Sequence, residues 1–287
     1  MKKHKICKIL LVILAIFLCV AFYELLGICV AYKKQPEVSN TTKKETKNGS
    51  WNECSENTER AVIIEKNPEA LLQRVRLIKN AKKEIILSTF AFQSDESGKL
   101  ILGALHDAAD RGVHIRLLVD GMESWIDMEG NPYFYGLSSH ENVEIKLYNK
   151  ANPLKPWKMM GRMHDKYLIA DGKRYILGGR NTYNYFLGDF PGHKNYDRDV
   201  LVVCDEPEKE NSVNQLSEYF ETIWNQEDSG YFHNNKKLAN RKSVKNAVLE
   251  LQNSYQKYFE ENKERICETD YTDETFETEK ITLVSNP

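Results

Sequence analysis

The sequence predicts an α/β fold, a layered mixed sheet flanked by helices, preceded by one N-terminal transmembrane helix. Short apolar runs rich in β-branched and aromatic residues, such as Glu84–Phe92, alternate with segments of helical period, which is typical of a sheet covered by helices. The run from Ile9 to Tyr32 is apolar over about the 20 residues that a bilayer crossing needs. A chain of 287 residues has room for one such domain behind this helix.

Three helices of the domain are predicted from their ends and from the spacing of their apolar residues. Asn67-Pro68-Glu69 has the pattern of an N-cap, a first-turn proline and an acidic residue at the positive end of a helix. Ser97-Gly98-Lys99 opens a second helix, which Gly112 closes. The third helix runs from Ser212 to Trp224. Apolar residues at helical spacing in the first and third are Leu71, Leu72, Val75, Ile78, Val213, Leu216, Phe220 and Ile223 or Trp224.

The predicted strands are short and bounded by turn residues. Besides Glu84–Phe92, the single strands are Val113–Val119, Val143–Tyr148 and Asp199–Val203. A hairpin is predicted where His164–Ala170 turns at Asp171-Gly172 into the return strand Tyr175–Leu177. These strands, separated by helices, favour one sheet with both faces covered.

The polar and apolar segments divide the chain into four parts. Residues 1–34 form a transmembrane anchor with a basic N-terminus, 35–60 a polar tether, 61–232 the α/β domain, and 233–287 a helical, acidic tail. The apolar run is broken only by Glu24, is longer than a signal-peptide core and shows no small-x-small cleavage site, so we expect it to remain uncleaved. Lysines flank both ends, and the positive-inside rule therefore leaves the orientation open. Because so short an N-terminal tail usually stays inside, we expect a single-pass cell-membrane protein with an extracytoplasmic domain.

The composition offers no obvious site for a nucleic acid or a metal. The net charge of −2 gives no basic footprint, so a nucleic-acid partner is not expected. The six cysteines have no metal-ligand spacing, and neither a metal nor another cofactor is expected. Cys54, Cys204 and Cys267 lie far apart in the sequence, and a disulfide between two of them is possible only if the domain lies outside the cytoplasm.

The predicted hairpin carries an H-x-K-x4-D pattern followed by G-G-x-N. The period of two in a strand places His164 and Lys166 on one face and Asp165 on the other. A neutral imidazole is a competent nucleophile near pH 7, and an adjacent ammonium stabilises charge that develops on a phosphate. A glycine pair lets backbone N–H groups approach a phosphate, and an asparagine adds a neutral donor. These phosphate-binding candidates are Gly178, Gly179 and Asn181.

The alternative interpretation is a solvated hairpin in which the histidine is incidental. The G-G-x-N pattern, which follows H-x-K-x4-D at the proper distance, argues against it. With these residues in view, positions 61 to about 225 resemble the first half of a bacterial protein of the phospholipase D superfamily, of the cardiolipin synthase type. The segments that carry the resemblance are RGVHIRLLVDG, PWK, GRMHDKYLIADGKRYILGGRNTYNYF, YDRDVLVV and NQLSEYFETIW. It implies an α/β domain that breaks and remakes phosphodiester bonds.

The resemblance also implies a role for each residue of the motif. His164 is the nucleophile, Lys166 the phosphate-binding cation and Asp171 an acid that steadies the motif, and these three form the expected catalytic set. Asp199, immediately before its strand, resembles the family acid that orients a histidine across the active site. Asp197, two residues earlier, lies at the same alternation and is the competing candidate for this acid. Asp199 is the better match because it immediately precedes the apolar strand.

The chain departs from the family in having one motif where such enzymes use two. In the two-motif enzymes one histidine attacks phosphorus while the other protonates the leaving alcohol. Here the other histidines, at positions 4, 106, 114, 140, 193 and 233, have no lysine two residues on. Ile281–Val284 looks like the start of a further strand, so we expect either a truncated chain that lacks its second half or a homodimer that completes the site.

The expected function is a membrane-anchored phosphodiesterase or phosphatidyltransferase, cardiolipin synthase-like, acting on a phospholipid through a phosphohistidine intermediate. Two alternatives stay open at this point. The first is a homodimeric single-motif nuclease. The second is a catalytically inactive remnant or scaffold.

Overall fold

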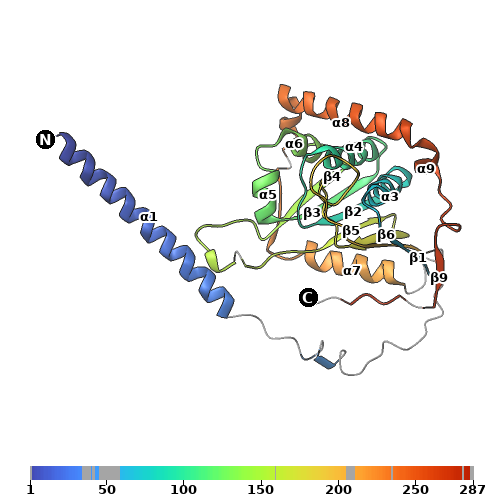
Figure 1. Cartoon of the computed structure of the whole chain (residues 1–287), viewed down its shortest axis with the longest axis horizontal. Coiled ribbons are helices and arrows are strands. Elements are labelled where there is room, and N and C mark those ends of the chain that lie inside the picture. Colours follow the sequence, from blue (N-terminus) through green and yellow to red (C-terminus); the bar gives the residue numbers. More distant parts are fainter. Residues whose placement is uncertain are drawn as a thin grey trace. The chain divides into compact units, whose positions relative to one another are not determined.

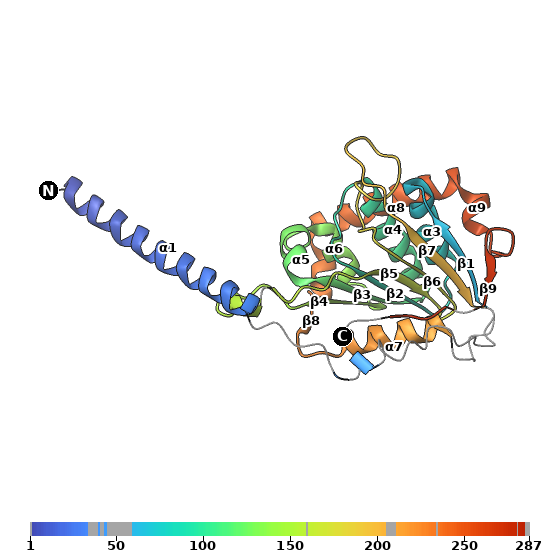
Figure 2. The ribbon, with the colours of Figure 1, turned by 60° about the horizontal axis from the view of Figure 1, so that its bottom comes forward.

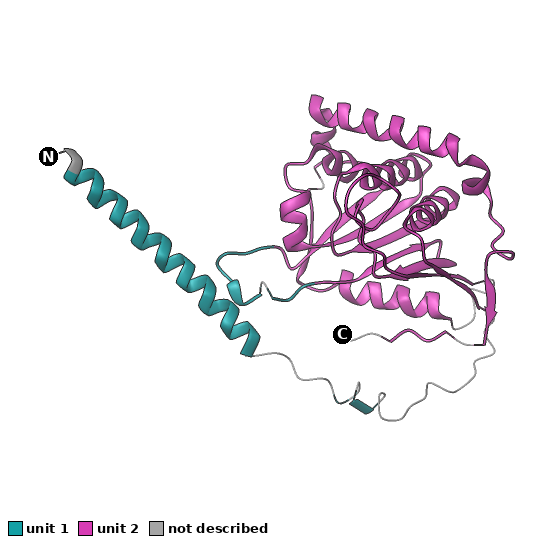
Figure 3. Ribbon diagram, viewed as in Figure 1, with its two compact units in different colours: residues 1–48, 151–162 teal, residues 49–150, 163–287 magenta. Residues whose placement is uncertain are grey.

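The computed structural model describes residues 2–33, 40, 43, 44, 59–158, 160–204, 211–233, 235–279 and 281–284. It divides into two compact units, shown in different colours in Figure 3. Unit 1 comprises residues 1–48 and 151–162, and unit 2 comprises residues 49–150 and 163–287. Most of the predicted tether lies outside the described residues.

Unit 1 contains the predicted anchor helix and a loop that comes from the middle of the chain. Helix α1 (Lys2–Lys33) is one continuous helix, and its segment His4–Lys33 is long and apolar enough to cross a membrane. No residue of its most apolar window is buried by the rest of the protein. The loop carries the short 3-10 helix η2 (Pro156–Lys158), which packs against α1.

Unit 2 is built on a mixed sheet that has nine strands within the described residues (Figure 1). The spatial order is β8-β4-β3-β2-β5-β6-β7-β1-β9. The three strands β2, β3 and β4 pair in parallel, and all other neighbours pair antiparallel. The bounds are β1 (Glu59–Ile64), β2 (Glu84–Thr89), β3 (His114–Asp120), β4 (Val143–Tyr148), β5 (Lys166–Ala170), β6 (Arg174–Gly178), β7 (Asp199–Cys204), β8 (Ser229–Tyr231) and β9 (Phe276–Thr278).

Helices cover both faces of this sheet, which confirms the predicted mixed α/β fold. Helix α7 lies along one face, and α3, α4, α6 and α8 lie on the other (Figure 2). The helix bounds are α3 (Asn67–Asn80), α4 (Glu96–Asp110), α5 (Gly121–Asp127), α6 (Pro132–Ser138), α7 (Ser212–Trp224), α8 (Lys242–Glu261) and α9 (Lys263–Cys267), with the 3-10 helix η3 (Lys236–Asn240) before α8.

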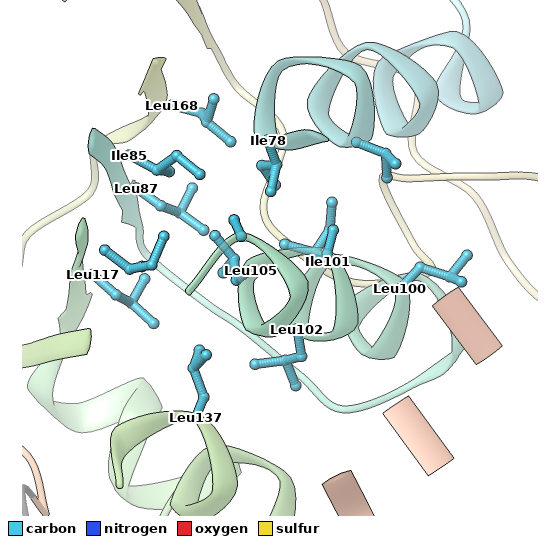
Figure 4. Close-up of a cluster of buried hydrophobic side chains, with 14 of the residues drawn as sticks. Ile78, Ile85, Leu87, Leu100, Ile101, Leu102, Leu105, Leu117, Leu137 and Leu168 are labelled. Carbon is cyan, nitrogen blue, oxygen red and sulfur yellow. The ribbon is translucent and has the colours of Figure 1, made fainter. Parts of the chain in front are cut away.

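The central strands are apolar on both faces because each face has its own core. In β2, Leu87 points into the larger core under α3 and α4, whereas its neighbour Ile86 joins the core under α7. Leu168 and Ile169 divide in the same way in β5. Figure 4 shows the larger core, where side chains from the strands meet those of α3, α4 and α6. Strands buried on both faces give continuous apolar runs, as the sequence has here.

Two local expectations are wrong in the structure. Asn67 is the first helical residue of α3 and not its N-cap; Lys66 takes that place without a side-chain cap bond. The Asn67 amide instead donates to the Asn195 carbonyl oxygen at 2.9 Å and accepts from Arg180 Nε at 3.1 Å. The Asn67 side chain, which the local pattern predicts to cap α3, therefore bonds to residues distant in the sequence. Ile281–Val284 is not a strand; Ile281 and Leu283 pack against the core under α7, and the Leu283 N–H donates to Gln215.

The acidic segment after α8 is part of the domain and not a dangling tail. Strand β9 pairs with β1 at the edge of the sheet. Arg76 of α3, 1% exposed, donates to the carbonyl oxygens of Glu268 and Asp270 and forms an ion pair with Glu274 at 2.8 Å. Its guanidinium also lies 3.9 Å from the ring centroid of the buried Tyr271. One buried cation thus fixes a segment that is distant in the sequence.

Candidate active site

The hairpin β5–β6 positions the motif as its alternation predicts. His164 lies two residues before β5 and is exposed, whereas Lys166 opens the strand and is 5% exposed. Asp165 points to the other face, where Tyr219 of α7 donates to its carboxylate at 2.9 Å. Burial raises the pKa of Asp165, and the bond from Tyr219 opposes that effect. The His164 imidazole and the Lys166 ammonium therefore lie on one face, and the Asp165 carboxylate between them in sequence lies on the other.

Phe90, which sequence reasoning did not identify, brings the histidine and the lysine together. Its ring lies edge-on to His164 with centroids 4.6 Å apart, and Lys166 Nζ lies 5.3 Å from its centroid. Phe90 directly follows β2, whose Thr89 pairs with Lys166 across the sheet. The sequence signal that could have identified Phe90 is its position, an aromatic residue just past the end of a central strand in the segment EIILSTFAF.

The Lys166 ammonium is held against the backbone at His164 and is partly removed from solvent. Its Nζ donates to the carbonyl oxygen of His164 at 2.5 Å. Burial lowers the pKa of Lys166 to about 8, against the opposing effect of the carboxylates of Asp165 and Asp197. The side chain is thus a cation at neutral pH that loses its proton close to the physiological range, and a phosphate would stabilise its charged form.

Asp120 at the end of β3 fixes the approach to the histidine. Its side chain is 1% exposed, and one oxygen accepts from the backbone N–H groups of Met122 and Glu123, which caps α5. The other oxygen accepts from the N–H of Met163 at 3.1 Å. The residue before His164 is therefore tied to the central strand β3. The aspartate that ends VHIRLLVD was the sequence signal for this contact.

The glycine pair after β6 lies against two aspartates. A side-chain carbon on Gly178 would fall 2.0 Å from Asp199 Oδ1, and one on Gly179 would fall 2.0 Å from Asp197 Oδ2. No other residue fits at either place without moving these carboxylates. The glycines are thus required for the close approach of the β7 segment, in addition to their expected role toward a phosphate.

The structure places Asp199 in a buried ion cluster. Its carboxylate accepts from Arg74 at 2.9 Å and lies 3.2 Å from Arg180, and the three side chains are 0%, 5% and 0% exposed. Asp197, two residues earlier, is half-buried, and its charge acts on Lys166. The sequence interpretation of Asp199 as the histidine-orienting acid does not agree with this arrangement, because Asp199 is held between two arginines.

Asp171 lies at the opposite end of β5 from Lys166, so it is not part of the group around His164. Its carboxylate accepts from the backbone N–H groups of Lys82, Lys83 and Glu84 at 2.7–3.1 Å. The residue has a positive φ of 55°, as the predicted tight turn requires. Its contacts steady the start of β2 and the hairpin, which agrees with the expected role of an acid that steadies the motif.

Asn181 links the ends of β2 and β6. Its side-chain oxygen accepts from the Ala91 N–H at 3.2 Å, and the next residue, Thr182, bridges to Phe92. The Asn181 side-chain NH₂ group has no hydrogen-bond partner within the described part of the chain. That orientation agrees with the expected role as a neutral donor toward a phosphate.

The remaining histidines of unit 2 have other partners. His106 and His140 share Asp110, His114 bonds to Glu144, His233 bonds to Glu129, and His193 packs against Tyr185. Among the described residues, no three histidine, cysteine or acidic side chains gather as a metal site. Cys204 is buried and Cys267 is exposed, both as free thiols; Cys54 lies outside the described residues.

Comparison with known proteins identifies the family. The family model "Cardiolipin synthase, PLD-like domain" matches residues 74–224, just over half of the chain. An uncharacterized protein of Helicobacter pylori (strain J99 / ATCC 700824) is 30% identical over 212 residues, which cover 69% of this chain and 39% of that protein. Cardiolipin synthase C of Escherichia coli (strain K12) is 30% identical over 154 residues, covering 49% of this chain and 31% of that enzyme. The match thus spans a minority of the length of these relatives.

A solved structure has a similar fold. Phosphatidylserine synthase of Haemophilus influenzae Rd KW20 superposes with a TM-score of 0.50 at 17% sequence identity, over 77% of this chain and 48% of that one. At this identity the likeness shows the fold alone. The matched residues 74–224 include the H-x-K-x4-D and G-G-x-N hairpin of this chain. Because the family model matches more than half of the chain, the chain belongs to the family of cardiolipin synthase, PLD-like domains.

Proposed function

We propose that this chain is a membrane-anchored phosphodiesterase or phosphatidyltransferase, cardiolipin synthase-like, that acts on phospholipids through a phosphohistidine at His164. The observation that carries the proposal is an exposed imidazole beside a buried ammonium, both in contact with the ring of Phe90. A nucleophile open to solvent, next to a cation that burial keeps poorly solvated, suits attack on an anionic phosphodiester.

The proposed reaction has two displacements at phosphorus. In the first, a nitrogen of neutral His164 bonds to phosphorus, the bond to the leaving alcohol oxygen breaks, and that oxygen takes up a proton. In the second, water or another alcohol loses a proton as it attacks phosphorus, the phosphorus–nitrogen bond breaks, and the imidazole is regenerated. The Lys166 ammonium offsets the charge on the non-bridging oxygens in both steps, and the Asn181 NH₂ group donates to the same oxygens.

The first displacement needs a proton donor for the leaving oxygen, and the sequence contains the motif once. We infer that a second histidine comes from another copy of this chain or from a second half. Asp197 is the carboxylate that we assign to orient a histidine, because it is half-buried, electrostatically coupled to Lys166 and packed on Gly179. An imidazolium formed during the reaction would be stabilised by such a carboxylate.

A phospholipid is preferred over a nucleic acid as the substrate for three reasons. The matching family model describes cardiolipin synthases. The chain also carries a helix of membrane-spanning length. Its net charge of −2 provides no excess of positive charge for binding a nucleic acid.

The test is to trap the covalent intermediate. Full-length chain in phosphatidylglycerol vesicles labelled with ³²P in the headgroup phosphate should acquire an acid-labile, base-stable label after rapid quenching. His164→Ala should abolish the label, whereas His114→Ala, which changes a half-buried histidine of β3 that bonds to Glu144, should retain it. Label on the His164→Ala chain would refute the assignment. Label from single-stranded DNA and none from lipid would favour a nuclease. No label from either would exclude activity of this chain by itself, and would favour an inactive scaffold or a site that needs a second half.

A further inference from the structure

The loop that precedes the catalytic motif combines exposed apolar side chains with cations. Leu154 is 79% exposed, Trp157 46% and Met160 52%. Residues 151–162 contain no acidic residue, and their charged residues are Lys155, Lys158 and Arg162. Exposed tryptophan and leucine interspersed with lysine and arginine are the composition of segments that bind the interface of an anionic bilayer.

This loop, residues 151–162, packs on the C-terminal part of α1 within unit 1. Pro156 lies so close to Gly27 that a side-chain carbon there would fall 2.3 Å from Pro156 Cγ. The Tyr23 hydroxyl donates to the Leu154 carbonyl oxygen at 2.9 Å. Among the described residues of α1, those buried or half-buried lie at helical spacing on one face: Glu24, Gly27, Ile28 and Ala31. The loop therefore covers one face of the anchor helix near its end.

The position of this contact along α1 corresponds to the membrane surface. A helix crosses the hydrocarbon core of about 30 Å in about 20 residues. Counted from Ile9, where the apolar run begins, the crossing ends near Ile28, next to Gly27. A loop held against Gly27 lies where headgroups meet acyl chains, the depth at which tryptophan is enriched in membrane proteins.

We propose that residues 151–162 are an interfacial segment that inserts Leu154 and Trp157 into the headgroup layer of an anionic bilayer. The inference rests on the proposed anchoring and deepens the proposed function. Arg162 is two residues from His164, so their Cα atoms are separated by at most about 7 Å. The segment then keeps the nucleophile at the membrane surface, and its substrate is a phospholipid of the bilayer that holds α1.

Quenching of a single tryptophan by brominated lipid tests the placement. The full-length chain, with Trp51, Trp125 and Trp224 changed to phenylalanine, is reconstituted in vesicles of phosphatidylcholine and phosphatidylglycerol whose acyl chains carry bromine at carbons 6 and 7. Trp157 emission should shift to the blue and fall at least twofold. A chain that retains only Trp224, the last residue of α7 and 5% exposed, is the unquenched reference. Bromine deeper in the acyl chains should quench Trp157 less, and omitting phosphatidylglycerol should weaken the effect.

A second pair of variants tests the loop without changing tryptophan. Leu154→Ser should raise the emission of the Trp157 chain in brominated vesicles toward its unquenched level. Leu249→Ser, which changes a leucine of α8 that is 57% exposed, should leave the quenching unchanged.

The outcomes separate this inference from the proposals on which it rests. If the chain floats with the vesicles after a carbonate wash and Trp157 is quenched no more than Trp224, the interfacial segment is refuted while the anchor stands. If the chain does not float, both the anchor and the segment are refuted. Neither result depends on turnover, so the phosphohistidine assay judges the proposed reaction separately.

Discussion

Replacing Asp199 by asparagine should unfold the domain at a lower temperature because the change leaves two buried arginines without a counter-charge. Asp199 and Arg180 have fully buried side chains, and the Arg74 side chain is 5% exposed. Breaking a buried ion pair by removing one partner costs about 3–5 kcal/mol. Asparagine keeps the size of the residue, so little of this cost comes from a cavity.

The expected loss can be converted to a melting temperature. A domain of this size loses roughly 2–4 °C for each kcal/mol, so Asp199→Asn should melt roughly 6–20 °C below the parent chain. Thermal unfolding of the full-length protein in detergent, followed by far-ultraviolet circular dichroism, measures the shift. Asp197→Asn is the matched control, since the same chemical change at a half-buried position should move the melting temperature by only a few degrees.

The same two variants should have the opposite order in catalysis. Asp197→Asn should lower the yield of labelled phosphohistidine by at least tenfold, whereas Asp199→Asn, assayed below its melting temperature, should label within a few fold of the parent. A stable Asp199→Asn chain that fails to label would refute the structural reasoning and restore Asp199 as the histidine-orienting acid.

Three further predictions concern the motif and the residues that position it. Affinity for a phosphodiester should fall as the pH rises through about 8, because Lys166 is charged below that pKa and neutral above it, and Lys166→Arg should move the fall to higher pH in a binding titration. A pH-independent affinity between 7 and 9 would contradict this. Asp171→Ala should destabilise the domain by about 1–2 kcal/mol through the loss of three backbone bonds and still label at His164, as denaturant unfolding and the labelling assay would show; an equally stable variant would exclude the structural role. Phe90→Ala should reduce labelling by about tenfold with a small change in melting temperature, and unchanged labelling would remove Phe90 from the site.

Local patterns in the sequence determined the elements whose geometry depends on neighbouring residues. The period of two predicted His164 and Lys166 on one face and Asp165 on the other. Phe90 contacts the first two and Tyr219 bonds to the third, although β5 itself begins only at Lys166. The bounds of α7 agree with its apolar spacing and those of β4 with its apolar run, since each buries a continuous apolar surface. The family was predicted from this hairpin together with the segments around it, and the match of the family model over residues 74–224 confirms that prediction.

The tertiary structure alone decided which polar residues meet. Asp197 and Asp199 have the same alternation in the sequence, and only the packing of Arg74 from α3 and of Arg180, two residues after β6, shows that Asp199 belongs to a buried ion cluster. The edge strands β1, β8 and β9 were not predicted either, because their pairing depends on segments far along the chain. Burial makes an unpaired charge or backbone group costly, so the partner that satisfies it is chosen by the whole fold and cannot be read from its neighbours in sequence.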